Sequence, residues 1–362
     1  MPPATAAPVV ELATAGMGAE VFDFLYPHNY IHPDLDRDAF AACWKAQFFE
    51  AGPACVLVAR DGGGRLIAHY GILPMPYAIG GKSARAGFIC QLFIDPAWRK
   101  TPLFFRLERR LLRDYPEFGF DFLYGLIAIK PALAGHLAMR YTRGPDWSVY
   151  AFPVAAGGGI RALWTGMPAA ARAAIDAVAR PLARAALALR RPAAGRVEVE
   201  EVADVGRMDW DLVARAQAGW RVHADRREEA FRRRIAPFGR KRYRVFAAAD
   251  GKARGYLVLR LTRVKRFAVA AIVDVIVPAG DEQAWNALLA HACHIGLENG
   301  SHAVVALARP GSPEARHLRS NLFFRTPSFF TLVYAVPEAL RPAGDAAWTG
   351  DWGLSWFDHD YI

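Results

Sequence analysis

One pattern recurs in this chain after about 182 residues, and it constrains the fold more than any other feature. Pro96 and Pro278 are 182 residues apart, and so are Trp147 and Phe329. The strand-like segments that recur in one order are 86–96 and 270–278, 120–127 and 302–309, and 146–154 and 328–337. Each half also has an upstream hairpin with an Asp-Gly turn, at 54–72 and at 243–260. We therefore expect a duplicated domain, with function inside each copy and where the copies meet.

Length and composition fit this expectation. A chain of 362 residues is long for one core and sufficient for two domains of about 150 residues. The apolar runs are shorter than the ~20 residues of a membrane span. The start has no basic region followed by an apolar core, as a secretory signal would have. We expect a soluble, cytoplasmic protein.

The cysteines suggest neither a disulfide framework nor a metal site. Cys43, Cys55, Cys90 and Cys293 have no CxxC or CxxH spacing. Cys293 lies close in sequence to two histidines, but on a helix it does not share their face. We expect no metal.

The positive charge is concentrated. The net charge is +10, and the basic residues gather in 159–197 and 223–244. Part of this excess is a solvated surface, and the rest fits an anionic membrane surface, a phosphorylated substrate or nucleic acid. The basic segments lack the interleaved aromatics of RNA-binding surfaces, so nucleic acid is not expected.

The order of elements predicts an α/β (α+β) fold. In each half a β-meander leads into β-α-β, which gives a mixed, mostly antiparallel sheet flanked by helices. The expected divisions are a first domain at 1–156, a linker at 157–197, a second domain at 198–340 and a tail at 341–362 that docks on a domain.

The linker is expected to contain a helix at 168–191. An apolar stripe runs along it, and Pro181 should kink it. Two interpretations stay open. The stripe packs on the adjoining domains, or the helix lies on an anionic membrane surface with its arginines toward the lipid headgroups.

The most informative local segment is 94–107. A buried strand ends at Pro96 and a helix begins within six residues, with Arg99 and Lys100 between them. Unpaired N–H groups and the helix dipole make such a junction attractive to anions. The segment therefore predicts a phosphate or pyrophosphate site.

This segment resembles motif A of the GNAT acyltransferase superfamily, Pro-x-Tyr-Arg-Gly-x-Gly-(Leu/Ile)-(Gly/Phe). The matching residues are Pro96, Trp98, Arg99, Leu103 and Phe104. The resemblance covers most of residues 9–154 and implies two tandem GNAT-like domains. It also implies acetyl-CoA or another acyl-CoA as co-substrate, with the diphosphate at Arg99, Lys100, Thr101, Leu103 and Phe104.

The match to motif A has departures. Lys100 and Pro102 stand where the family usually has glycines, and Pro102 has no N–H to offer a phosphate. In the second copy, Asp281 and Glu282 stand at the helix start, where they repel a pyrophosphate. We expect that copy to bind a partner or substrate.

The resemblance also suggests residues for catalysis. Motif B usually has a tyrosine ahead of a Gly-aromatic pair, which implies that Tyr141, ahead of Gly144, protonates the leaving thiolate. Gln91 lies on the strand that would carry the pantetheine, whose amides would pair with backbone at Phe93 and Ile94. His69, on the adjoining strand, is a candidate base.

A closer resemblance is to tandem GNAT-like proteins of bacterial exopolysaccharide and cell-surface biosynthesis. The matching features are the Tyr124-Gly strand, Trp147 with Tyr150 and Pro153, the arginines of 226–234, Asp274, and the tail from Trp352 to Asp360. It implies that Tyr124 and Asp274 bind a polar, saccharide-like acceptor. For Asp274, pairing with an arginine of 226–234 is an equal alternative, because a carboxylate inside a strand requires a partner.

Three functions follow from these observations. The first is an acyl-CoA-dependent N- or O-acyltransferase whose polar acceptor binds at the domain seam. The second is an aminoacyl transferase that resembles the Fem family and uses charged tRNA. The third is a non-catalytic binding or scaffold protein in which both cofactor sites have decayed.

Overall fold

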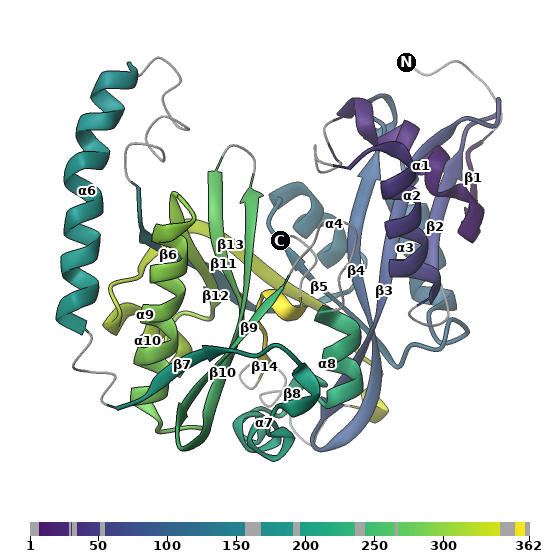
Figure 1. The fold of residues 1–362 in the computed structure, drawn as a ribbon. Coiled ribbons are helices and arrows are strands. Elements are labelled where there is room, and N and C mark those ends of the chain that lie inside the picture. Colours follow the sequence, from purple (N-terminus) through teal and green to yellow (C-terminus); the bar gives the residue numbers. More distant parts are fainter. Residues whose placement is uncertain are drawn as a thin grey trace. The chain divides into compact units, whose positions relative to one another are not determined.

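The computed structural model describes residues 7–28, 30, 35–50, 55–155, 168–190, 196–235, 243–264, 267–340 and 352–358 (Figure 1). The chain divides into two compact units. Unit 1 contains 1–145, 237–241 and 330–351, and unit 2 contains 146–236, 242–329 and 352–362. We describe each unit by itself.

Unit 1 is a six-stranded sheet with helices. Its strands pair in the order β1-β2-β3-β4-β5-β13, and only β4 and β5 are parallel. The strands are β1 (Val9–Leu12), β2 (Cys55–Arg60), β3 (Leu66–Ile79), β4 (Lys82–Ile94), β5 (Phe122–Ile127) and the second part of β13 (Phe324–Ala335). The helices and helical turns are η1 (Ala15–Met17), α1 (Gly18–Leu25), η2 (Tyr26–His28), α2 (Arg37–Lys45), η3 (Ala46–Glu50), η4 (Pro96–Trp98), α3 (Leu103–Asp114), α4 (Lys130–Ala138) and η7 (Glu338–Leu340).

Side chains show which helices cover each face of this sheet. Trp44 of α2 contacts His69, and Phe48 of η3 lies against Gly71, so α2 and η3 cover one face of β3. Tyr70 points the other way and meets Glu108 of α3. The Asp36 carboxylate caps α2 by accepting the N–H of Ala39 at 2.8 Å.

Unit 2 has a second mixed sheet, in the order β6-β12-β11-β10-β9-β7, in which only β11 and β12 are parallel. Its strands are β6 (Thr142–Pro153), β7 (Glu198–Glu201), β8 (Val222–Ala224), β9 (Arg244–Asp250), β10 (Lys252–Val264), β11 (Phe267–Ile276), β12 (Ala303–Ala308) and β14 (Trp352–Gly353). Its helices and helical turns are α6 (Ala169–Arg190), η6 (Val205–Arg207), α7 (Trp210–Gln217), α8 (Glu228–Ile235), α9 (Glu282–Glu298), α10 (Pro313–Ser320) and η8 (Trp356–Asp358).

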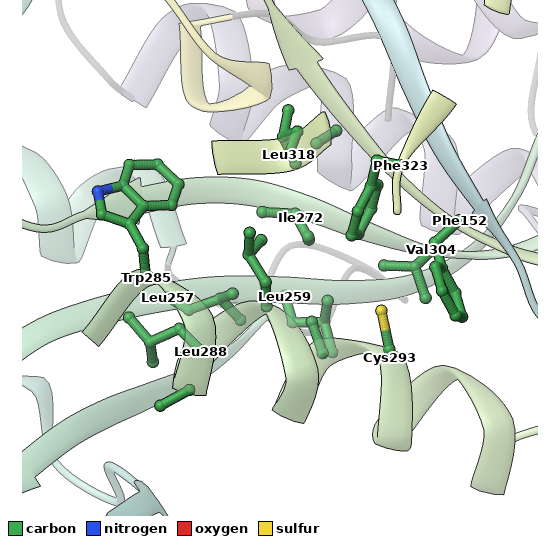
Figure 2. Packing of buried hydrophobic residues seen from close by; sticks show 14 of the residues in the cluster. Phe152, Leu257, Leu259, Ile272, Trp285, Leu288, Cys293, Val304, Leu318 and Phe323 are labelled. Atoms are coloured by element: carbon green, nitrogen blue, oxygen red, sulfur yellow. The ribbon is translucent and has the colours of Figure 1, made fainter. Parts of the chain in front are cut away.

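The core of unit 2 lies between this sheet and α9. Leu257, Leu259 and Ile272 of the central strands pack against Leu288 and Cys293 of the helix (Figure 2). Burial raises the pKa of the Cys293 thiol, which is therefore an inert core residue rather than a metal ligand. Among the described residues, no three His, Cys, Asp or Glu side chains lie together as a metal site would require.

The last strand of each half pairs in the other unit. From residue 146 onward β6 belongs to unit 2 and pairs with β12, whereas β13 from residue 330 belongs to unit 1 and pairs with β5. The units therefore differ from the predicted domains at 1–156 and 198–340. Strand periodicity does not reveal this exchange, because an unpaired sheet edge offers the same backbone groups in both units.

The 182-residue offset recurs in backbone geometry. Arg140 and Leu322 are non-glycine residues with positive φ, of 66° and 67°, and each is followed by a buried aromatic residue. β4 has a bulge at Gln91, and the register of β11 shifts at Val273, also 182 residues on. These features are what a duplicated domain would give.

The predicted helix between the halves is present as α6, and it contains Pro181. Leu187 is buried in the unit 2 core, whereas Val178 and Leu182 are exposed. The packing interpretation thus holds for the end of the helix, and contact with a membrane surface stays a prediction. None of the described helices combines the length and hydropathy that crossing a bilayer demands.

Candidate functional site

Strands β4 and β5 of unit 1 separate soon after they pair. They are hydrogen-bonded at only three positions, Ala86–Phe88 with Phe122–Tyr124, although β4 continues to Ile94 and β5 to Ile127. Gly125 lies where they separate, and a Cβ there would collide with the side chain of Ile89. The separation leaves one edge of β4 without a strand partner from β5.

A β-bulge interrupts β4 along this open edge. Phe93 is opposite His69 and Cys90 is opposite Gly71, so Tyr70 faces both Gln91 and Leu92. Gln91 has a φ of 48°, in the left-handed region. A bulge of this kind redirects the peptide groups of a strand and often adjoins a functional site. The structure thus gives Gln91 a role in backbone shape, and its predicted catalytic role stays a prediction.

Alternation along β4 determines which peptide groups face the open edge. The N–H of Asp95 donates to the Ile67 carbonyl at 2.9 Å, so the peptide groups of Phe93 also pair with β3, and those of Ile94 face outward. The bulge turns Leu92 outward as well. The peptide groups of Phe93 are therefore used within the sheet, whereas those of Ile94 are not, and contact of either residue with a pantetheine stays a prediction.

Both outward carbonyls have partners within the protein. The Tyr30 hydroxyl donates to the Leu92 carbonyl at 3.1 Å, and Arg99 Nε donates to the Ile94 carbonyl at 3.0 Å. The Arg99 guanidinium also lies 5.3 Å from the centre of the Phe93 ring. A ligand that pairs with this edge must displace Tyr30 and Arg99.

The β4–α3 junction is exposed and basic. Asp95 caps η4 by accepting the N–H of Ala97 at 2.9 Å, and it pairs with Arg65 at 3.2 Å. Arg99, Lys100 and Pro102 are exposed, and the first turn of α3 contains no acidic residue. The helix dipole and the two cations make this helix start electropositive.

The side chains of the other predicted ligands at this junction contact the protein, and their role in binding stays a prediction. The Thr101 hydroxyl donates to the Trp98 carbonyl at 2.7 Å, and Leu103 is buried in the core. The Phe104 ring packs edge-on against His136, 5.3 Å away, and lies over Gly135. Phe104 thus faces α4, and its side chain does not cover the exposed N–H groups of the helix start.

His69 is fully buried between two partners. Its Nε2 accepts from the Trp44 indole N–H at 3.1 Å, so Nδ1 carries the hydrogen that points to the Gln91 carbonyl at 2.9 Å. Burial lowers the pKa of His69 to about 4. With its lone pair occupied, His69 fixes the bulge and has no position from which to accept a substrate proton.

Four polar side chains meet on the opposite face of β3. Tyr70 OH donates to Glu108 Oε1 at 2.6 Å, and His136 Nε2 lies 3.1 Å from the same oxygen. The Tyr141 hydroxyl lies near Glu108, and burial and then the Glu108 carboxylate raise the pKa of Tyr141 well above 10. Of these four, Tyr141 was predicted from the sequence as the acid. Glu108 could have been found from the sequence, because helical spacing places its carboxylate on the apolar stripe of α3 between Phe104 and Leu112.

The motif B match changes in detail. The chain turns at Arg140, which has a φ of 66°, whereas Gly144 lies within β6 against Leu332. The turn therefore falls one residue before Tyr141 and not at Gly144, and the acid role of Tyr141 stays a prediction.

The equivalent junction in unit 2 is acidic. The Asp281 carboxylate caps α9 by accepting the N–H of Ala284 at 3.0 Å, and it forms two hydrogen bonds with Arg254. Glu282 stands in the first turn. A carboxylate already caps this helix start, and its charge would repel another anion there.

Asp274 pairs with an arginine of 226–234, which is one of its two predicted alternatives. It is buried and pairs with Arg226, which also reaches Asp358 at 3.2 Å and Ser355 at 3.3 Å. Burial raises the pKa of Asp358. The described tail residues 352–358 belong to unit 2, and this network helps to hold them there. Tyr124 is fully buried among Tyr77 and other rings, and substrate binding by Tyr124 or Asp274 stays a prediction.

Comparisons with known proteins support the fold. No family model matches the chain, and no curated protein matches it in sequence. An N-myristoyltransferase of Saccharomyces cerevisiae with bound myristoyl-CoA aligns with a TM-score of 0.63 at 14% identity, over 92% of this chain and 85% of that one. A GCN5-related N-acetyltransferase from Anabaena variabilis gives 0.58 at 12% identity, over 91% and 73%. Another from Kribbella flavida gives 0.57 at 14% identity, over 92% and 72%.

These similarities agree with the architecture described above. The mixed, mostly antiparallel sheet flanked by helices was predicted from the sequence and is confirmed. The chain has the fold of the GNAT-type acyltransferases.

Proposed function

We propose that unit 1 binds an acyl-CoA and that the protein transfers the acyl group to a polar acceptor. The diphosphate would lie on the first turn of α3, next to Arg99 and Lys100. The pantetheine would lie along the open edge of β4 and pair with the peptide groups of Leu92 and Ile94.

One observation carries this proposal: β4 and β5 separate immediately before a basic helix start. An extended amide chain needs an unpaired strand edge, and a diphosphate needs free N–H groups and cations. Unit 1 supplies both next to one another. Solved proteins of the same fold are described as N-acetyltransferases and as an N-myristoyltransferase with bound myristoyl-CoA.

The chemical identities of the acyl donor and of the acceptor are proposed from resemblances in sequence. We propose acetyl-CoA as the donor because the nearest motif, around Arg99, resembles that of acetyltransferases. A sugar amine or hydroxyl is the proposed acceptor, on the resemblance carried by Tyr124 and the tail. Tyr141 is the proposed acid for the thiolate.

A second candidate function is binding without catalysis. It is favoured by one observation, that Tyr30 and Arg99 already occupy the outward carbonyls of β4. In that case acyl-CoA would not compete successfully for the edge.

Thermal unfolding with acetyl-CoA tests the proposal. A ligand that binds only the folded protein raises the melting temperature as its concentration exceeds Kd. Arg99→Ala and Lys100→Ala should each raise Kd by about tenfold or more, since a charged hydrogen bond contributes about 1.5–3 kcal/mol.

The matched control is Arg109→Ala, which removes an exposed cation from the same helix beyond its first turn. It should leave Kd unchanged. A wild-type melting temperature that does not respond to millimolar acetyl-CoA would reject acyl-CoA as the ligand.

A further inference from the structure

The cluster of Tyr70, Glu108, His136 and Tyr141 lies out of contact with solvent. Each side chain is at most 4% exposed, and they come from β3, α3, α4 and the residue before β6. Four ionisable groups in one dry place are expensive to bury unless they share protons. The hydrogen-bond distances indicate which atoms of the cluster carry protons.

His136 carries a proton on Nδ1, because this atom lies 2.7 Å from the Ala132 carbonyl, which only accepts. Its Nε2 lies 3.1 Å from Glu108 Oε1, and two acceptor atoms at that distance repel unless a proton lies between them. Tyr70 does not supply it, since its hydroxyl points to Oε1 at 2.6 Å and is 3.3 Å from Nε2. A proton on Nε2 satisfies these contacts, because Nε2–H then faces both Oε1 and the Tyr70 oxygen.

Two polar atoms of the cluster lack partners. Among the described residues, neither the Tyr141 hydroxyl nor Glu108 Oε2 has a hydrogen-bond partner, and both are buried. Such atoms typically cost about 1–3 kcal/mol each, so proteins retain them where something binds or reacts. The Tyr141 hydroxyl thus interacts with Glu108 without a hydrogen bond of ordinary geometry.

The cluster adjoins the proposed acyl-donor site. Tyr70 stands opposite the bulge residues Gln91 and Leu92, on the strand edge proposed to carry the pantetheine. Glu108 is five residues into α3 from Leu103, about 7.5 Å along the helix from its basic start. The cluster thus lies along the stretch of β3, β4 and α3 that the proposed donor would follow.

We propose that Tyr70, Glu108 and His136 form a buried proton store that recharges Tyr141 during acyl transfer. This proposal rests on the proposed function of unit 1. Tyr141 is the catalytic residue that meets the thiolate, and the other three are positioning residues that act through it.

The step balances as follows. The acceptor's nitrogen or oxygen forms a bond to the thioester carbon, the C–S bond breaks, and its electron pair stays on sulfur. Tyr141 gives its proton to that thiolate. The proton on His136 Nε2 passes through Glu108 to the Tyr141 oxygen, and the proton that the acceptor loses restores the store.

Two further ionisable groups affect the cluster. Tyr115, at the end of α3, interacts with Tyr141, and Cys90 of β4 interacts with Tyr70. Any pH dependence of the reaction must be compared with variants of these two, Tyr115→Phe and Cys90→Ala.

The first experiment measures the pH profile of kcat for Glu108→Gln. Glutamine keeps the shape and the hydrogen bonds but cannot relay a proton, so kcat should fall about 10- to 100-fold and the pH dependence should change, while KM for acyl-CoA is kept. Glu117→Gln, an exposed change just beyond α3, is the matched control. A Glu108→Gln enzyme with wild-type kcat and pH profile overturns the proposal.

The second experiment does not depend on activity or on a variant that folds. Nitrogen-15 NMR of the histidines in the wild-type chain reports which ring nitrogens carry protons, and we expect His136 to be protonated on both. A bare Nε2 on His136 overturns the proton store.

The two proposals fail separately. Absence of acyl-CoA binding rejects the proposed function, whatever NMR finds at His136. Acyl transfer that is unaffected by Glu108→Gln, or a bare Nε2, rejects only the proton store.

Discussion

The two strand-to-helix junctions, after Pro96 in unit 1 and after Pro278 in unit 2, share a backbone plan and differ in charge. The first presents exposed Arg99 and Lys100 at a helix start without acidic residues. The second places Asp281 on the helix start as a cap. A carboxylate there stabilises the helix through the same N–H groups that would otherwise hold a phosphate.

The strands before these junctions also separate differently. In unit 1 pairing with the parallel neighbour stops at Phe88, before the bulge at Gln91. In unit 2 it continues to Ile272, next to the register shift at Val273. The sequence offset places Leu307 where unit 1 has Gly125. The comparison teaches that one backbone plan can leave a strand edge open or paired, according to a few side chains.

The largest effect is expected in unit 2, where the buried charges hold structure together. Arg226→Ala would leave Asp274 and Asp358 buried without their shared cation, at a cost of about 3–5 kcal/mol in unfolding free energy. Denaturant unfolding measures it. Arg233→Ala, which breaks an exposed pair with Glu229, is the control and should cost under about 1 kcal/mol. Equal losses in the two variants would show that Arg226 has no special structural role.

A second effect concerns pH and belongs to unit 1. The pKa of His69 is about 4 in the folded protein and 6.5 when unfolded, so the unfolded chain binds the extra proton between these values. Stability is therefore fully present above pH 6.5 and falls by about 3 kcal/mol as the pH drops to 4. Unfolding measured across this range should show a smaller pH-dependent loss in His69→Gln. An unchanged slope in that variant would exclude His69 as the source.

A third effect tests the separation of β4 and β5. Gly125→Ala places a Cβ against Ile89, which should cost about 1–3 kcal/mol and weaken acyl-CoA binding by shifting the strands. Gly16→Ala is a suitable control, since no atom lies within 4 Å of the added Cβ. Calorimetric titration gives both affinities. If Gly125→Ala binds as tightly as Gly16→Ala, the groove does not depend on this separation.

The smallest effect is expected at the unit 2 junction. Asp281→Ala removes the cap of α9 and should cost about 1 kcal/mol. It should not alter the affinity for acyl-CoA, because the ligand is expected at unit 1. A change in that affinity would move the ligand to unit 2.

The fold class could be predicted because apolar periodicity and turn residues indicate the order of strands, helices and turns. The hairpins and the helix after Pro96 lie close to where they were expected. The exchange of β6 and β13 was not predictable, since alternation along a strand is the same whichever edge it joins.

The site was predicted where one segment carries the chemistry and missed where distant segments meet. Arg99 and Lys100 are adjacent in sequence, so the sequence alone places both at the same strand-to-helix junction. The partners of His69 are Trp44 and a carbonyl brought close by the bulge, and neither is visible in a motif. The same holds for His136, whose contact with Glu108 depends on the packing of α3 against α4.

A crystal structure with CoA tests the central claim most directly. We predict density for the diphosphate at the first turn of α3 beside Arg99 and Lys100, with Tyr30 displaced from the Leu92 carbonyl and no density at the start of α9. CoA bound beside Asp281, or no CoA in crystals soaked at saturating concentration, would contradict the assignment of the ligand site to unit 1.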